Sequence, residues 1–273
     1  MLERRITYWN FHDSVIFAEF DQCERPSVEL FTGEARRQAA MKKSVLNLFR
    51  RLHKAFDSIV LELITDAPGD FGYSIRRRYW KSRLLYLGQN VQIEVGVHIQ
   101  DPAYVSIGDH CWIDRHVSIL AGPDRSSREK VALTNALYRG APSVVHIGRN
   151  VHVGPFSIIS GISSGVYISD DCGFSAFCKV YAFTSHYRSP RAPGNRSIHF
   201  GPRVPHVRQV IVEGPIFLGE NTGIALGVTV LPGVAIRENS FVRINTVVSA
   251  GEYAPNSVLQ GDPAERVGDR FSS

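Results

Sequence analysis

The feature that most constrains this chain is a repeat of six residues. Aliphatic or aromatic residues, here called anchors, occupy every sixth position in sets of three. The anchors are Leu87, Ile93, Ile99; Ile107, Ile113, Ile119; Ile147, Val153, Ile159; Ile168, Phe174, Val180; Leu218, Ile224, Val230; and Ile236, Val242, Val248. An amphipathic helix spaces apolar residues three and four apart, and an amphipathic strand spaces them two apart. Neither period is six.

A parallel β-helix fits this period, because each six can form one short strand and one turn. Glycine and asparagine occur where turns are expected, as in "IGRNVH" and "LGENTG", and both tolerate a positive φ. Most anchors are followed four residues later by a small or β-branched residue. Stacking coils about 4.8 Å apart would bury both positions in one column. The sequence therefore predicts an all-β core of about six triangular coils.

The repeat is interrupted only between sets of three. Interruptions follow Ile99, Ile119, Ile159 and Val180, and two of them are long insertions, at residues 120–146 and 186–217. If three sixes complete one triangular coil, every insertion leaves from the same corner. His186 is the first residue after the last regular six before the second insertion. We therefore expect His186 at a corner, beneath an extruded loop.

Composition excludes several classes of protein. The 273 residues are 44% hydrophobic and 21% charged, which is typical of a globular chain, and nowhere do 18 apolar residues run together. We therefore expect a cytoplasmic protein. Cys111, Cys172 and Cys178 occupy small inward positions, without CxxC spacing, and are expected to be buried and reduced. The net charge of +5 suits an anionic small molecule or membrane surface, and no nucleic-acid motif accompanies it.

The first 84 residues form a separate N-terminal extension in this interpretation, ahead of a repeat domain at 85–268. Residues 41–66 place Val45, Leu48, Phe49, Leu52, Phe56, Ile59, Val60 and Leu63 at helical spacing. A basic run, "RRRYWKSR", follows at residues 76–83. We expect an amphipathic helix that either caps the open first coil or contacts an anionic membrane through residues 41–83, and the cap is slightly favoured.

The closing coils resemble those of hexapeptide-repeat acyltransferases, and more closely the sugar and polysaccharide O-acetyltransferase branch. The similarity covers about residues 70–268. It includes the "LPGV" turn at 231–234, "GDPA" at 261–264, and the Thr/Ser-containing approach "YAFTSHY" before a loop. The resemblance implies a left-handed β-helix, which the period alone does not show.

The same resemblance implies the site. His186 would be the general base that takes a proton from a sugar hydroxyl as it attacks acetyl-CoA, because an imidazole ordinarily titrates near neutrality. The thioester would lie near Ala225 and Leu226, and pantetheine would follow Ile244, Asn245 and Ser249. Arg243, Arg266 or Arg270 would hold the CoA phosphates, with Arg266 preferred. Homotrimers that share sites between subunits, and a saccharide acceptor, are also implied.

Two departures from the family pattern keep alternatives open. The frequent Trp-Ile-Gly is Gly223, Ile224 and Ala225 here, and the frequent Thr-Lys-Asp is Ser249, Ala250 and Gly251. The missing lysine favours a catalytically inactive scaffold as one alternative, and N-acetylation of an amino-sugar is another. A carbonic anhydrase-like metal site would need histidines such as His110, His116, His146 and His152 to meet across coils or subunits. We therefore expect no metal.

Overall fold

The computed structural model describes residues 33–201 and 203–271, in two compact units. The first unit ends at Asp57 and the second begins at Ser58. The described part of the first unit is helix α1 (Gly33–Thr65), whose last residues belong to the second unit. The second unit continues with helix α2 (Gly69–Lys81) and the strands. None of the described helices is long and apolar enough to span a membrane.

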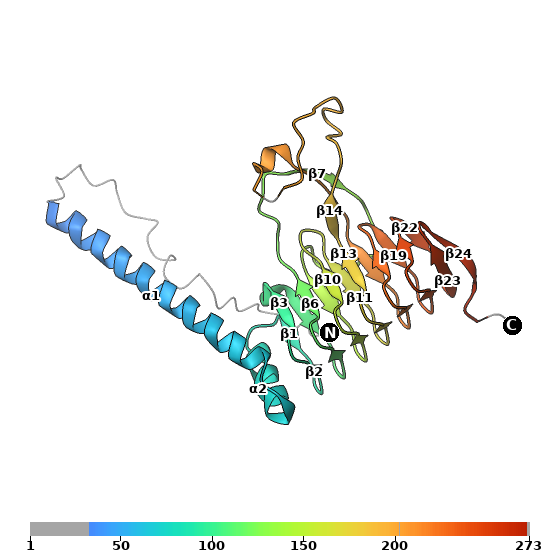
Figure 1. Cartoon of the computed structure of the whole chain (residues 1–273), viewed down its shortest axis with the longest axis horizontal. Coiled ribbons are helices and arrows are strands. Elements are labelled where there is room, and N and C mark those ends of the chain that lie inside the picture. The colour runs from blue at the N-terminus through green and yellow to red at the C-terminus, as the bar shows by residue number, and fades with distance from the viewer. Residues whose placement is uncertain (1–32, 202, 272–273) are drawn as a thin grey trace, which may run out of the picture. The chain divides into compact units, whose positions relative to one another are not determined.

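Three parallel sheets form the body of the second unit (Figure 1). Sheet A contains β1 (Tyr86–Leu87), β4 (Val105–Ile107), β8 (Val145–Ile147), β11 (Val166–Ile168), β16 (Ile216–Leu218), β19 (Val234–Ile236) and β22 (Gly251–Tyr253). Sheet B contains β2 (Gln92–Ile93), β5 (Trp112–Ile113), β9 (His152–Val153), β12 (Gly173–Phe174), β17 (Gly223–Ile224), β20 (Phe241–Val242) and β23 (Ser257–Gly261), closed by antiparallel β24 (Ala264–Asp269). Sheet C contains β3 (His98–Gln100), β6 (Ser118–Leu120), β10 (Ile158–Ser160), β13 (Lys179–Tyr181), β18 (Thr229–Val230) and β21 (Val247–Val248).

The chain visits sheets A, B and C in turn, so each set of three strands makes one coil. In the described chain the strand triplets starting at β1, β4, β8, β11, β16 and β19 are complete coils. Anchors pair with anchors one coil away: Ile113 with Val153, and Phe174 with Ile224. The predicted register and the mostly-β, parallel architecture are therefore confirmed, whereas the predicted left-handed sense stays a prediction. Residue 84 as a domain boundary stays a prediction too.

The anchors form one continuous core. Ile107, Ile113, Ile119, Ile147 and Ile159 are all fully buried, as are most later anchors. The inward cysteines are buried and reduced as predicted. Burial raises the pKa of Cys172 to about 12, and the pKa values of Cys111 and Cys178 to about 11. These thiols are therefore part of the packing rather than reactive groups.

Every interruption of the coil lies between sheet C and sheet A, as the repeat predicts. Two short ones hold the 3₁₀ turn Pro102–Tyr104 and residues 161–165. The two long ones pair with each other in sheet D, formed by β14 (Phe183–Ser185), β15 (Val210–Glu213) and β7 (Glu129–Ala132). Strand β15 lies between the other two, antiparallel to β14 and parallel to β7. Thr184 lies four residues after the anchor Val180, so the repeat predicts it as an inward residue of the coil. This prediction is wrong: Thr184 is exposed, because β14 leaves the coil and pairs with β15.

Helix α2 packs on the first coil. Trp80 is 3% exposed and belongs to the core cluster. Arg76 is 1% exposed; its Nε donates to Ile93 O at 2.8 Å, and one terminal nitrogen donates to Ala67 O at 2.5 Å. Burial lowers the pKa of Arg76, and nearby Glu94 partly opposes this. The element that covers the open coil end is therefore α2, which lies after the amphipathic helix expected at 41–66 and contains most of the basic run.

Candidate functional site

His186 lies where the chain turns out of β14 into the long loop of the second insertion. Its backbone N–H donates to Val210 O at 2.8 Å, which extends the β14–β15 pairing by one residue. Val210 is 3% exposed and is the register partner of Glu129 on β7. Sheet D therefore fixes the main chain at His186, and the side chain is only partly buried. His186 thus lies at the end of an extruded strand of sheet D, and not in the coil itself, where the repeat had predicted it at a corner.

The imidazole of His186 has one defined polar partner. Its Nδ1 lies 2.6 Å from the carbonyl oxygen of Arg188. A carbonyl only accepts, so Nδ1 carries the proton in this contact, and the neutral ring presents an unprotonated Nε2. The backbone N–H of Arg188 is also 3.4 Å from Nδ1, but the shorter contact decides the tautomer. In the described part of the chain Nε2 has no hydrogen-bond partner, so it is available to accept a proton.

Side chains on sheet D form two polar groups that hold the insertions together. Lys130 lies 3.2 Å from Glu213 and 3.7 Å from Asp124, and Arg128 lies 3.0 Å from Asp124. Burial raises the pKa of Asp124, but the hydrogen bonds from Arg128 and Ser126 outweigh it, and the pKa is lowered overall. This group joins the first insertion to the end of β15.

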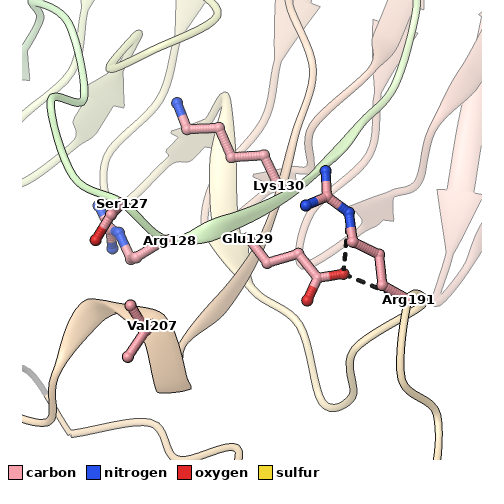
Figure 2. A pocket seen from close by; sticks show the side chains of 6 residues that line it. All are labelled: Ser127, Arg128, Glu129, Lys130, Arg191 and Val207. Atoms are coloured by element: carbon pink, nitrogen blue, oxygen red, sulfur yellow. Dashed lines mark hydrogen bonds and ion pairs between the residues drawn. The ribbon is translucent and has the colours of Figure 1, made fainter.

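The second polar group borders a pocket of about 400 Å³ (Figure 2). Glu129 accepts a hydrogen bond from the buried Ser189 hydroxyl at 2.7 Å, and its other oxygen faces Arg191 at 3.9 Å. The pocket is lined by Ser127, Arg128, Glu129, Lys130, Arg191 and Val207. Because Val210 separates Glu129 from the His186 backbone, the pocket lies one strand away from the candidate base. A polar acceptor could be oriented there.

Four of the predicted acyl-CoA residues, Ala225, Leu226, Ile244 and Asn245, lie at a different corner, between sheets B and C. The N–H of Asn245 donates to Leu226 O at 2.9 Å, so these two turn residues stack on successive coils. Leu226 is 47% and Ile244 is 64% exposed, whereas Ala225 is buried. The backbone N–H of Leu226 has no acceptor in the described chain. Leu226 and Ile244 thus form an exposed apolar surface, here called the ledge, beside one free N–H. The ledge fits a pantetheine arm, and the N–H fits a thioester carbonyl.

The remaining predicted contacts are scattered. Ser249 follows β21 at the corner between sheets C and A, and its carbonyl accepts from the Tyr253 hydroxyl at 3.0 Å. Arg266 is an exposed residue of β24 that pairs with Asp269. Arg243 bonds Gln260, and Arg270 bonds Asn221 O at 2.6 Å. Among these arginines no shared phosphate site is formed in one chain.

His186 and Leu226 do not share a corner. His186 leaves the body between sheets C and A, whereas Leu226 lies in the turn between sheets B and C. The described chain therefore does not bring the candidate base and the candidate thioester position together at one corner.

An aromatic ladder at the Leu226 corner was not predicted. The rings of His116 and Phe156 stack with centroids 5.1 Å apart, and those of Phe156 and Phe177 with centroids 5.3 Å apart. Gly227 occupies the next coil, because its N–H donates to Ala176 O at 3.1 Å. His116, Phe156, Phe177 and Gly227 all have a positive φ. His116, Phe156 and Phe177 each lie three residues after the second anchor of a set of three. Aligning the sets at that position would have found the ladder.

The other described histidines are dispersed over the coils. No group of three or more His, Cys, Asp or Glu residues within 33–201 and 203–271 is arranged to hold a metal ion. His146 stacks on Tyr167 with ring centroids 4.4 Å apart, and burial lowers the pKa of His146. His152 lies 3.6 Å from Asp114, and His110 lies 3.4 Å from Asn90.

Comparisons with known proteins find similarity in structure. No protein-family model matches the chain, and no curated protein matches it. A mutant of AntD, an N-acyltransferase from Bacillus cereus, in complex with dTDP and coenzyme A, has a TM-score of 0.58 at 20% identity, covering 72% of this chain and 89% of that one. AntD with dTDP and 3-hydroxybutyryl-CoA gives a TM-score of 0.55 at 18% identity, covering 72% and 88%. A hexapeptide-repeat acetyltransferase from Vibrio cholerae, complexed with acetyl coenzyme A, gives 0.47 at 17% identity, covering 78% and 84%. At these identities the likeness is one of fold.

Proposed function

We propose that this protein is an acyltransferase that moves an acetyl group from acetyl-CoA to a hydroxyl group of a saccharide, with His186 as general base. The observation that carries the proposal is the 2.6 Å contact between His186 Nδ1 and Arg188 O, because a proton on Nδ1 makes Nε2 the proton-accepting nitrogen of the neutral ring. A sugar hydroxyl is a poor nucleophile until a base removes its proton in the transition state. A neutral imidazole held by the backbone is suited to that step.

The proposed reaction needs no covalent enzyme intermediate. His186 Nε2 takes the hydroxyl proton as the sugar oxygen attacks the thioester carbon. The Leu226 N–H stabilises the negative charge that develops on the carbonyl oxygen. The C–S bond then breaks, and the sulfur leaves as CoA thiol with the proton that His186 accepted. The thioester lies beside Ala225 and Leu226. Ile244, Asn245 and Ser249 bind the pantetheine arm, and Arg266 binds a CoA phosphate.

The separation of His186 and Leu226 on two corners favours a shared site. In a homotrimer, a face of one subunit can present His186 to the Leu226 corner of its neighbour. The resemblance of the closing coils to hexapeptide-repeat enzymes supports the same assembly, as well as a left-handed coil. We further propose that the protein acts in the cytoplasm, in the synthesis of a surface polysaccharide or glycolipid.

Transfer to the amino group of an amino-sugar is the second candidate. The observation in its favour is that AntD, which shares the fold, is an N-acyltransferase crystallised with dTDP-4-amino-4,6-dideoxyglucose and coenzyme A. A primary amine also loses a proton during acyl transfer, so His186 would keep its role.

One experiment tests the proposal and separates the two candidates. Release of CoA thiol from acetyl-CoA is measured with a panel of neutral sugars, sugar nucleotides and their 4-amino counterparts, and the products are identified as esters or amides by mass spectrometry. Ester formation supports the first candidate, and amide formation supports the second. Binding of acetyl-CoA without turnover of any acceptor, or no binding at all, would favour the inactive scaffold.

A further inference from the structure

Helix α1 carries an apolar stripe whose described side chains are exposed. Met41, Val45, Leu48 and Phe56 are spaced four, three and eight residues apart, which places them on one helix face. They are 63%, 47%, 56% and 64% exposed, respectively. We call these four residues the α1 stripe. Single exposed apolar residues are ordinary, but four on one face of a helix indicate a surface that binds something.

Within the segment 41–56, which carries the stripe, every charged residue is basic. Residues 41–56, "MKKSVLNLFRRLHKAF", contain Lys42, Lys43, Arg50, Arg51 and Lys54 and no acidic residue. Lys42 and Lys43 are exposed in the structure. A helix that combines an apolar face with a polar face rich in lysine and arginine is the type that lies in the plane of a membrane interface. An anionic surface would complement each of these charges.

A second copy of the chain is a poorer occupant. Homotypic helix pairs gain from acidic and basic residues that alternate beside the apolar seam, so that opposite charges meet across it. Residues 41–56 supply only basic residues, so two copies of this segment would bring like charges together.

We propose that α1 binds the surface of a membrane containing anionic lipids, with the α1 stripe entering the acyl boundary and Lys42 and Lys43 contacting lipid headgroups. The segment expected to contact membranes extended to residue 83, and this proposal restricts it to α1, because α2 packs on the coil through Trp80 and Arg76. The binding does not depend on the proposed acyltransferase activity.

Sedimentation with vesicles of defined composition tests the proposal. The full chain is mixed with vesicles of phosphatidylcholine alone or with 30% phosphatidylglycerol added, at about 0.1 M and 0.5 M salt. We expect binding to the anionic vesicles at low salt, and weakening by at least about tenfold at high salt, because part of the attraction is screened. Equal binding to both vesicle types, or no binding to either, would overturn the proposal.

Matched variants identify the surface that binds. Val45→Glu with Leu48→Glu removes the apolar part, Lys42→Glu with Lys43→Glu removes the basic part, and Leu85→Glu changes a 56% exposed leucine outside α1. Both α1 variants should bind anionic vesicles at least about tenfold more weakly than the wild type, and Leu85→Glu should bind normally. Thermal melting checks that each variant is folded. If the α1 variants bind vesicles like the wild type, α1 does not contact the membrane and the proposal fails. If Val45→Glu with Leu48→Glu lowers the mass measured by light scattering, the α1 stripe binds another protein chain, and the proposal fails as well.

Discussion

The Nδ1 atom of His186 and the carbonyl oxygen of Arg188 lie 2.6 Å apart. Both belong to the segment that leaves sheet D, and the backbone of His186 is tied to Val210 at 2.8 Å. The ring is thus oriented by its own loop, while the strand pairing holds its main chain. This arrangement separates proton transfer from donor binding, and the first two predictions depend on that separation.

Replacing His186 with alanine should lower turnover by about 10²- to 10⁴-fold, the usual effect of a positioned general base. The dissociation constant for acetyl-CoA should stay within about twofold of the wild type, because Leu226 and Ile244 of the proposed donor site are at another corner. Steady-state kinetics and calorimetry measure the two quantities. His206→Ala, in the same insertion, serves as the control and should keep most activity. Near-normal turnover in a folded His186→Ala protein would remove His186 from the mechanism.

Replacing Ile244 with glutamate should weaken acetyl-CoA binding by about tenfold or more. The side chain is 64% exposed, so the substitution should leave the melting temperature nearly unchanged. A carboxylate on the ledge would stay hydrated and repel the CoA phosphates. Leu85→Glu, which also exchanges an exposed aliphatic residue, should bind acetyl-CoA normally. Equal affinities in the two variants would show that the donor does not follow the Leu226–Ile244 corner.

The body of the fold could be predicted because its information is local and periodic. The anchors recur every six residues, and stacking the coils buries each anchor against the corresponding anchor of the next coil. Ile113 and Val153 are one such pair. The interruptions could be assigned to one corner for the same reason. His186 was found as the residue at which that pattern stops.

Sheet D could not be predicted, because its strands come from two insertions that carry no repeat. Glu129 and Val210 are register partners although 81 residues separate them, and neither segment shows the pairing in its own sequence. The Arg188 contact of His186 depends on loop geometry in the same way. The aromatic ladder of Phe156 and Phe177 was accessible in principle, since it repeats once per coil, but only after the sets of three are aligned.

Replacing Gly72 with alanine should destabilise the cap on the first coil. A Cβ at this position would lie 1.9 Å from Ala67 O and 2.9 Å from the Arg76 guanidinium, so α2 would have to move away from the end of α1. We expect the free energy of unfolding to fall by about 2–4 kcal/mol, since the contact is with backbone and Arg76 is buried. Denaturant titration measures it.

The matched control for this change is Gly194→Ala. No atom lies within 4 Å of a Cβ built at Gly194, and its φ is not in the left-handed region. Its stability should therefore stay within about 0.5 kcal/mol of the wild type. Similar stability losses in both variants would contradict the close packing of α2 against Ala67.

Replacing Asp124 with asparagine should destabilise sheet D in a pH-dependent way. Its side chain is 7% exposed and bonded to Arg128, so the loss at pH 7 should be about 1.5–3 kcal/mol. The pKa of Asp124 is lowered in the folded protein, because the bonds from Arg128 and Ser126 outweigh its burial. The unfolded chain therefore binds the proton more tightly, and the stabilisation is present above the ordinary carboxyl pKa of about 4 and is lost as the pH falls through the folded value. Unfolding titrations of both proteins from pH 7 to pH 3 should show curves that converge below about pH 4, whereas Glu265→Gln, at an exposed position of β24, should follow the wild type throughout. A difference that stays constant with pH would mean that Asp124 contributes through shape rather than through its charge.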